Sequence, residues 1–466
     1  MNVVLRGGAE IAGLLLGVIS TVWVSRAVGP SYFGYYAVTL TAIALGSTVI
    51  NAGLSTAGSQ RVANQPELAA EVWWAVLVGR TAIAVPTVLA AMIVIVVAPL
   101  DPILRDFLVV GMVASALMPL RAEWLLVAQG RLRAVSLARV LGSAGSVLAA
   151  ILLIHDPADA ALMPWVPVTY AMVAAVATVL LSARSTLPRR PKGESPRAVL
   201  GGYVRDGANY LKNDVSVFIF TTSDRLFLYV FATTTVVGLY EAAYRVIQPF
   251  YTISAVVGDA LYLPLAKSYG GPELQLVFRR YVDLMCFATV PLGVFLLLFA
   301  PTVIEILYGP TYADATPYLA ILGWVITFGY TSAVAVVPFS AWNRPREFGN
   351  ATGLGGAFNL IFNVLLIPPF QGLGAAWATV LAKVVVTIAG IRYFRRATDY
   401  PLVRDWLEYL AISAAAGLVA LASSQLAPPG PFGLIAFGLV YVPLVGAVRW
   451  RKHLGSGSTR APVRPS

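Results

Sequence analysis

The chain has 466 residues, of which 58% are hydrophobic and 12% are charged, and its mean hydropathy is +0.77. A soluble globular protein carries roughly 25% charged residues, so this composition excludes that class. The formal net charge of +11 would suggest nucleic-acid binding in a soluble protein, but in a membrane protein its distribution among the loops reports orientation instead. We therefore expect a membrane protein with no nucleic-acid partner.

Apolar stretches long enough to cross a bilayer recur from one end of the chain to the other. A crossing helix needs roughly 20 predominantly apolar residues to cover about 30 Å of hydrocarbon. The predicted spans, taken in chain order, are residues 8–28, 35–56, 75–98, 107–128, 136–154, 161–182, 213–234, 238–262, 282–304, 317–340, 350–368, 372–392, 406–427 and 431–449. The sequence thus predicts an all-α polytopic membrane protein of about 14 transmembrane helices.

Few residues in the chain are suited to catalysis or to metal binding. The single cysteine, Cys286, excludes an internal disulfide and a multi-thiolate metal site. The two histidines, His155 and His453, are too far apart in sequence to support chelation or a catalytic pair. No G-x-x-x-x-G-K-[ST] phosphate loop is present. We expect no metal, no cofactor and no enzymatic activity.

The basic residues are distributed unequally between the two sides of the membrane. Of the 33 Lys and Arg residues, 24 fall in one alternating set of loops and in the terminal segments, and only Arg26 and Arg105 fall in the other set. Loops rich in Lys and Arg stay in the cytoplasm. This imbalance predicts that both termini are in the cytoplasm and supports an even number of spans. We expect the protein to reside in the cytoplasmic (inner) membrane.

Two short echoes indicate a duplicated lobe. Residues 34–36 (GYY) are echoed by 238–240 (GLY) after 204 residues, and residues 128–133 (AQGRLR) are echoed by 341–346 (AWNRPR) after 213 residues. Both echoes fall on equivalent predicted elements. Because each half has an even number of spans, the repeats are parallel and related by an axis along the membrane normal.

The longest hydrophilic stretch, 184–205, contains three prolines and follows the sixth span, so it separates the two lobes. The predicted parts are an N-terminal lobe (1–183, spans 1–6), a cytoplasmic inter-lobe linker (184–209), a C-terminal lobe (210–398, spans 7–12), an appended helix pair (399–450) and a cytoplasmic tail (451–466).

Three groups of residues resemble one protein family. Residues 24–36 (VSRAVGPSYFGYY) resemble the opening of polysaccharide flippases of the multidrug/oligosaccharidyl-lipid/polysaccharide exporter superfamily. Asp224-Arg225 and then 237–245 (VGLYEAAYR) look like that family's seventh and eighth helices. The third group comprises 307–312 (LYGPTY), Asn359, Asn363, 366–368 (LIP) and 372–379 (GLGAAWAT).

This resemblance implies a V-shaped bundle of two six-helix lobes that works by alternating access. The implied function is to move a polyprenyl-diphosphate-linked oligosaccharide across the cytoplasmic membrane for cell-surface polysaccharide biosynthesis. The implied partners are that lipid-linked oligosaccharide, membrane lipids and polysaccharide-assembly proteins. Two alternatives stay open: a drug or metabolite antiporter of the same superfamily, and a polytopic glycan polymerase or glycosyltransferase. Fourteen spans favour the lipid substrate over the antiporter, and short outer loops disfavour the enzyme.

Charged residues inside predicted spans are the best clues to a site. Such a residue costs roughly 2.5–3.5 kcal/mol at a helix centre, so it generally faces a partner or a wet cavity. A diphosphate headgroup needs cationic donors, and the candidates for a cationic cavity are Arg26, Arg80, Arg245 and Lys383. Arg26 rests on the family resemblance. The candidates for polar contact with sugar hydroxyls are Asn359 and Asn363, and those for ion or proton coupling are Glu10, Asp224 and Asp259.

Each candidate also has a structural alternative. Glu241 and Arg245 stand four residues apart on one helix and could neutralise each other. Arg80 could snorkel to the inner headgroups, and Lys383 could pair with a neighbouring helix. The two asparagines could instead form hydrogen bonds between helices, and the aspartates could pair with basic residues there. The sequence leaves these alternatives open.

Overall fold

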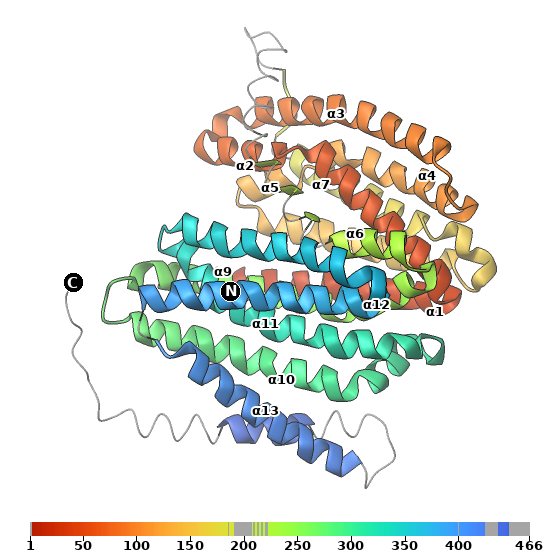
Figure 1. The fold of residues 1–466 in the computed structure, drawn as a ribbon. Helices are drawn as coiled ribbons and strands as arrows, with labels where there is room; N and C mark the ends of the chain where they lie inside the picture. The colour runs from red at the N-terminus through yellow and green to blue at the C-terminus, as the bar shows by residue number, and fades with distance from the viewer. Residues whose placement is uncertain are drawn as a thin grey trace. The chain divides into compact units, whose positions relative to one another are not determined.

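Every regular element that the structure describes is a helix (Figure 1). The computed structural model describes residues 2–424 and 437–446, apart from 185, 191–206, 208–209, 212–213, 216–217, 220–221 and 399. Within these residues, nine helices are long and apolar enough to cross a membrane. Each predicted span overlaps a described helix. The prediction of an all-α polytopic membrane protein is therefore confirmed.

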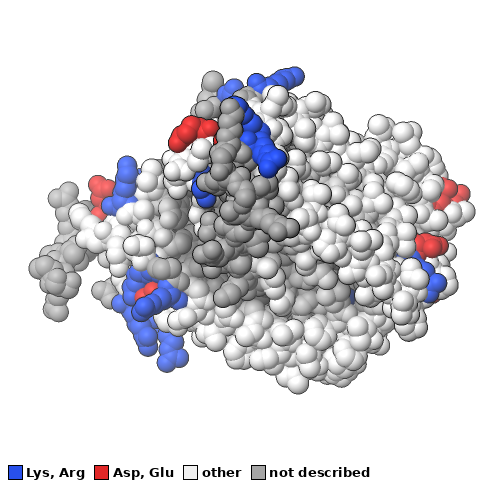
Figure 2. Space-filling model, turned by 90° about the horizontal axis from the view of Figure 1, so that it is seen from above, with Lys and Arg blue, Asp and Glu red and all other residues white. Residues whose placement is uncertain are grey.

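The surface is apolar over large areas. Helix α3 (Ala69–Val97) exposes a series of large aliphatic side chains, among them Val85, Leu89, Ile93 and Val97. Figure 2 shows that Lys, Arg, Asp and Glu gather at a few places, with broad uncharged surface between them. Exposed apolar surface on this scale is rare on soluble monomers and is what contact with lipid requires.

The described helices form two compact units, residues 1–241 and 242–466. In the first unit, α1 packs against α4 and α6, and α6 packs against α7. Helix α1 spans Asn2–Asn51. Besides α1 and α3, this unit contains α2 (Leu54–Asn64), α4 (Pro102–Ala116), α5 (Glu123–Ala128), α6 (Leu132–Leu153), α7 (Trp165–Ala183) and the helical residues 222–231. Helix α9 (Thr234–Ser268) begins in this unit and continues into the second. The predicted lobe boundaries stay a prediction.

Helix α1 contains two spans separated by a break at Gly29. Gly29 has φ 78° and ψ 172°, a conformation that glycine adopts without steric cost. Pro30 follows it and starts the second segment, where its missing N–H needs no partner. The Gly-Pro pair therefore separates the first two predicted spans, 8–28 and 35–56.

The fourth predicted span, 107–128, is interrupted in the structure. Helix α4 ends at Ala116, a short 3₁₀ turn (Met118–Leu120) follows, and α5 starts at Glu123. Pro119 lies in that turn, where its ring prevents a continuous helix. At this break, the carbonyl of Arg121 accepts a hydrogen bond from the side chain of Arg80.

In the second unit, α10 packs against α11 and α13, and α11 packs against α12. The helices that follow α9 are α10 (Leu274–Tyr308), α11 (Thr316–Ala341), α12 (Pro345–Ala397), α13 (Leu402–Ser424) and Phe437–Gly446. Helix α12 contains the eleventh and twelfth spans. Its halves meet just after Pro368 and Pro369, at Gln371, which has φ 47°.

Tyr400 stands in the turn between α12 and α13. Its hydroxyl donates to Oδ2 of Asp405 over 2.6 Å. Burial, followed by the hydrogen bond to Asp405, raises the pKa of Tyr400. The folded state therefore holds this proton more tightly than the unfolded chain. The stabilising contribution is complete below the unfolded pKa of about 10 and is lost as the pH rises above that value.

We expect the Tyr400→Phe variant to be less stable than the wild type by about 1 kcal/mol near neutral pH, because Asp405 loses a donor. The difference should shrink as the pH rises above about 10, since the wild type then loses the same contribution. Thermal unfolding of the detergent-purified proteins at several pH values measures both effects. A difference that stays constant across that range would contradict the assignment.

Candidate functional site

Three charged side chains are buried together where the helical residues 222–231 meet the start of α9. Asp224, Arg225 and Glu241 are 5, 8 and 1% exposed. The Nε of Arg225 lies 2.5 Å from Oε2 of Glu241, and its Nη1 lies 3.8 Å from Oδ1 of Asp224. Tyr240 donates its hydroxyl to Oδ2 of Asp224 over 2.5 Å. One guanidinium thus serves both carboxylates, and we call these four residues the buried charge cluster.

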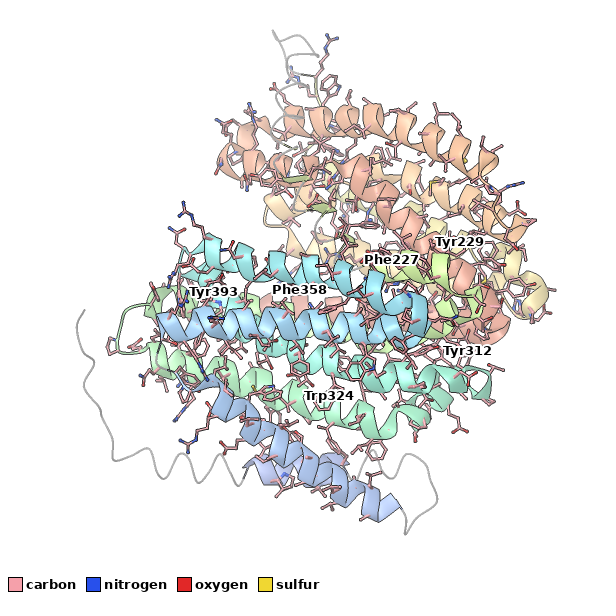
Figure 3. The ribbon with its side chains drawn as sticks, viewed as in Figure 1. Phe227, Tyr229, Tyr312, Trp324, Phe358 and Tyr393 are labelled. Atoms are coloured by element: carbon pink, nitrogen blue, oxygen red, sulfur yellow. The ribbon has the colours of Figure 1, made fainter. Side chains whose placement is uncertain are left out.

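The buried charge cluster holds two carboxylates against one guanidinium. Phe227 and Tyr229 follow Arg225 on the same helical segment (Figure 3), and Phe227 stacks on Phe231 with 6.4 Å between ring centroids. A carboxylate buried beside other charged groups can bind a proton or a cation. Asp224 was predicted as a coupling residue, and its surroundings suit that role, which stays a prediction.

Arg80, on α3 in the first unit, is fully buried and only 1% exposed. Its Nη1 donates to the carbonyl of Arg121 over 2.9 Å, and its Nη2 donates to Oδ1 of Asn51 over 2.8 Å. Nη2 also donates to the Ser55 hydroxyl. Within the described residues, its Nε is buried and has no hydrogen-bond partner. Arg80 therefore does not snorkel to a surface here; it ties α3 to the α1–α2 junction and to the break before α5.

The second unit holds two buried asparagines on the first half of α12. The Nδ2 of Asn363 donates to Oδ1 of Asn359 over 3.3 Å. Phe358, the neighbour of Asn359, is labelled in Figure 3. On the second half of α12, the buried Thr379 and the half-buried Lys383 stand one turn apart. The two asparagines thus contact each other within one helix, and their role toward sugars stays a prediction.

The other predicted site residues are spread over both units. Arg26 is exposed on α1, three residues before the break at Gly29. Arg245 is half-buried on α9 and donates Nη1 to Oε1 of Gln248 over 3.2 Å. Glu10 and Asp259 lie on α1 and α9, but their side chains are outside the described part of the structure.

Five residues whose side chains make these contacts were not among the predicted site residues: Arg225, Glu241, Tyr240, Asn51 and Ser55. Asn51 and Ser55 stand at the end of the second predicted span, and Arg80 stands near the start of the third. Consecutive antiparallel spans place those positions at one depth, so a polar pair opposite a buried arginine was a usable signal. Tyr240 carried no such signal, because its partner Asp224 lies across a turn. Among the described residues, no group of three or more His, Cys, Asp or Glu could hold a metal ion.

Comparison with known sequences finds a family and distant relatives. The profile of a family described as "Polysaccharide biosynthesis protein" matches residues 23–317. An uncharacterized membrane protein of Methanocaldococcus jannaschii is 30% identical over 118 residues, which are 25% of this chain and 23% of that protein. The "Probable low-salt glycan biosynthesis flippase Agl15" of Haloferax volcanii is 24% identical over 234 residues, 48% of each chain. This chain thus spans about half or less of the length of these curated relatives.

Comparison with solved structures finds the same fold over nearly the full length. The structure titled "Lipid II flippase MurJ, inward closed conformation" superimposes with a TM-score of 0.81 and covers 97% of this chain and 100% of that one. The two sequences are 13% identical, so the likeness concerns the fold. It confirms a multi-pass membrane architecture of this type for the chain.

Proposed function

The chain belongs to the polysaccharide biosynthesis protein family, and on this basis we propose that it is a flippase for a lipid-linked oligosaccharide. It moves its substrate between leaflets and neither makes nor breaks a covalent bond. The single observation that carries the proposal is the family match over residues 23–317. The fold shared with a lipid flippase and the name of the Haloferax volcanii relative support it.

The substrate is a polyprenyl-diphosphate-linked oligosaccharide destined for a cell-surface polysaccharide. Its diphosphate carries concentrated negative charge and must lose water to enter the membrane, so it requires cationic donors at depth. The residues proposed for this task are Arg26, Arg80, Arg245 and Lys383, and Asn359 and Asn363 are proposed to bind sugar hydroxyls. Arg80 stands apart from the others because both of its terminal nitrogens already bind groups of the first unit.

The protein is proposed to reside in the cytoplasmic membrane with both termini in the cytoplasm, as the basic loops indicate. Its partners there are the lipid-linked oligosaccharide, membrane lipids and polysaccharide-assembly proteins. Energy is proposed to enter through carboxylates within the membrane, with Asp224 in the buried charge cluster and with Glu10 and Asp259 on α1 and α9. A proton or cation that binds there would change the net charge of its site during the cycle.

Gene deletion with rescue tests the function in the cell. Deletion is expected to deplete the surface polysaccharide and to trap the lipid-linked precursor on the cytoplasmic side, and the wild-type gene should reverse both effects. The Lys383→Ala, Arg245→Ala double variant should fail to release the precursor. Each lost charge-assisted hydrogen bond costs about 1.5 kcal/mol, so the loss of both should slow transport on the order of 100-fold.

The matched control is the Arg279→Ala, Arg280→Ala double variant, which removes two exposed arginines from α10. It should rescue fully at the same membrane level. If deletion leaves the surface glycan unchanged, the flippase proposal is wrong and drug or metabolite export becomes the better assignment. If the wild type and the Lys383, Arg245 variant rescue equally, those two residues are not headgroup ligands.

A further inference from the structure

Helix α1 meets the start of α9 with backbone against backbone. A Cβ added to Gly34 would overlap the carbonyl oxygen of Thr234, and a Cβ added to Gly238 would overlap the carbonyl oxygen of Pro30. At the same place, the hydroxyls of Ser31 and Thr234 lie 3.4 Å apart. This close contact fixes which side chains of the two helices stand next to each other.

The start of α4 packs against the same part of α1. The rings of Tyr35 and Phe107 meet edge to face with 6.2 Å between their centroids, and Phe107 is only 1% exposed. Asp101 precedes α4 and caps it, because its Oδ1 accepts from the backbone N–H of Ile103 over 2.9 Å. Tyr35 and Asp101 are therefore both held by helical structure.

Five polar side chains come together where these segments meet: Ser31, Tyr35, Asp101, Tyr229 and Thr234. The hydroxyl of Tyr35 interacts with Asp101 and Thr234, and Tyr229, on the helical residues 222–231 (Figure 3), interacts with Tyr35 and Asp101. Ser31 and Asp101 are exposed, and the other three side chains are half-buried. We call these five residues the outer polar cluster, and its exposure makes it accessible to a ligand.

In the predicted topology, the outer polar cluster lies at the non-cytoplasmic face. Its members lie in or beside the stretches between predicted spans 1 and 2, 3 and 4, and 7 and 8, which belong to the loops with few Lys and Arg. Tyrosines alone are common at such an interface, where their rings sit at the level of the lipid headgroups. That role does not explain an exposed carboxylate that interacts with two tyrosines.

We propose that the outer polar cluster binds a sugar residue of the lipid-linked oligosaccharide at the non-cytoplasmic face. This inference rests on the proposed flippase function. Neighbouring sugar hydroxyls donate to a carboxylate, and hydroxyl side chains both donate and accept. A tyrosine adds an apolar ring on which the C–H face of a sugar ring packs. One carboxylate, four hydroxyls and two aromatic rings at one exposed place supply both kinds of contact.

The charge of the outer polar cluster selects the sugar rather than the diphosphate. Asp101 is its one charged member, and a carboxylate repels phosphate oxygens. The capping bond to Ile103 uses one of about four acceptor positions that a carboxylate offers, so Asp101 can still accept from sugar hydroxyls. Calcium takes six to eight oxygen ligands, commonly from several carboxylates, so a single aspartate favours a sugar over that cation.

Binding of a free oligosaccharide tests the proposal without a transport step. The probe is the lipid-free oligosaccharide hydrolysed from the host's own surface polysaccharide, and saturation-transfer NMR with the full-length protein in detergent measures its affinity. The wild type should bind, with the strongest transfer to ring C–H protons. Asp101→Asn keeps the cap on α4 but loses the charge, so it should weaken binding about tenfold. Tyr229→Leu should weaken binding and reduce transfer to the ring C–H protons.

The matched control is Asp106→Asn, which neutralises another exposed aspartate on α4 and should bind like the wild type. All three variants should unfold at the wild-type temperature. The inference is overturned if the wild type does not bind the probe, if it binds only with added calcium, or if Asp101→Asn and Tyr229→Leu bind as tightly as the wild type. The flippase proposal is judged separately, since it fails only if gene deletion leaves the surface glycan unchanged.

Discussion

An Arg225→Ala variant is expected to lose about 3–5 kcal/mol of folding stability, since the substitution leaves two buried carboxylates without their shared partner. Domains are stable by only about 5–15 kcal/mol, so little folded protein should remain in the membrane. Arg225 contacts both Glu241 and Asp224 in the buried charge cluster, and Tyr240 alone cannot neutralise Asp224. The amount of monodisperse protein extracted in mild detergent, and its unfolding temperature, measure the effect.

Two comparison variants separate lost charge balance from general sensitivity. Arg225→Met combined with Glu241→Met removes a charge of each sign, and replacing a buried pair with apolar groups is often close to neutral. This double variant should recover part of the stability, and the remaining loss is the cost of Asp224, which no longer contacts Arg225. Arg139→Ala removes an exposed arginine that pairs with Glu123 and should change stability by less than about 0.5 kcal/mol. An Arg225→Ala protein as stable as the wild type would contradict the contacts described for the cluster.

An Arg80→Ala variant is expected to be the second most damaging substitution. It removes the donors that reach the Arg121 carbonyl, Asn51 and Ser55 from a side chain that is 1% exposed. Each buried acceptor left without a donor costs about 1–3 kcal/mol, so the total should exceed about 3 kcal/mol. Arg80→Lys keeps the charge but lacks the planar fork that serves several acceptors, so it should recover only part of the loss.

The same measurement distinguishes the two roles of Arg80. If Arg80 is a structural residue, the Arg80→Ala variant should have a lower unfolding temperature than the wild type. Its transport should then fall only as far as the amount of folded protein falls. A headgroup ligand predicts an unchanged unfolding temperature and a specific loss of transport. Arg279→Ala serves as the control for removing an arginine from the surface, because its side chain is exposed.

Most of the fold could be predicted because hydropathy reports membrane spans directly. The predicted spans also ended close to two helix breaks. Gly29-Pro30 lies between the predicted spans 8–28 and 35–56, and Pro368-Pro369 lies at the boundary between 350–368 and 372–392. The interruption of the fourth span at Pro119 was not predicted, although proline is the cause. A single proline is tolerated in many membrane helices, and only the tertiary setting decides whether it bends or ends one.

The contacts of the candidate site were harder to predict than its members. Buried charges such as Arg225 and Glu241 are conspicuous in an apolar sequence, but their pairing joins residues 16 apart across a turn, which local spacing does not predict. The echo of Gly34 in Gly238 indicated duplication, and nothing in it revealed that the two copies touch. Such pairings depend on how helices cross, which composition and periodicity do not encode.

Transport in reconstituted vesicles is the most direct test of the central claim. The purified protein is placed in liposomes with a polyprenyl-diphosphate-linked oligosaccharide that carries a fluorescent label, proton and sodium gradients are imposed in turn, and an impermeant quencher is added outside. The flippase account predicts that, under at least one gradient, quenching goes beyond the label of the outer leaflet, as it does not in protein-free vesicles. Quenching that stops at the outer leaflet under every gradient, with protein shown to be folded, would contradict the account.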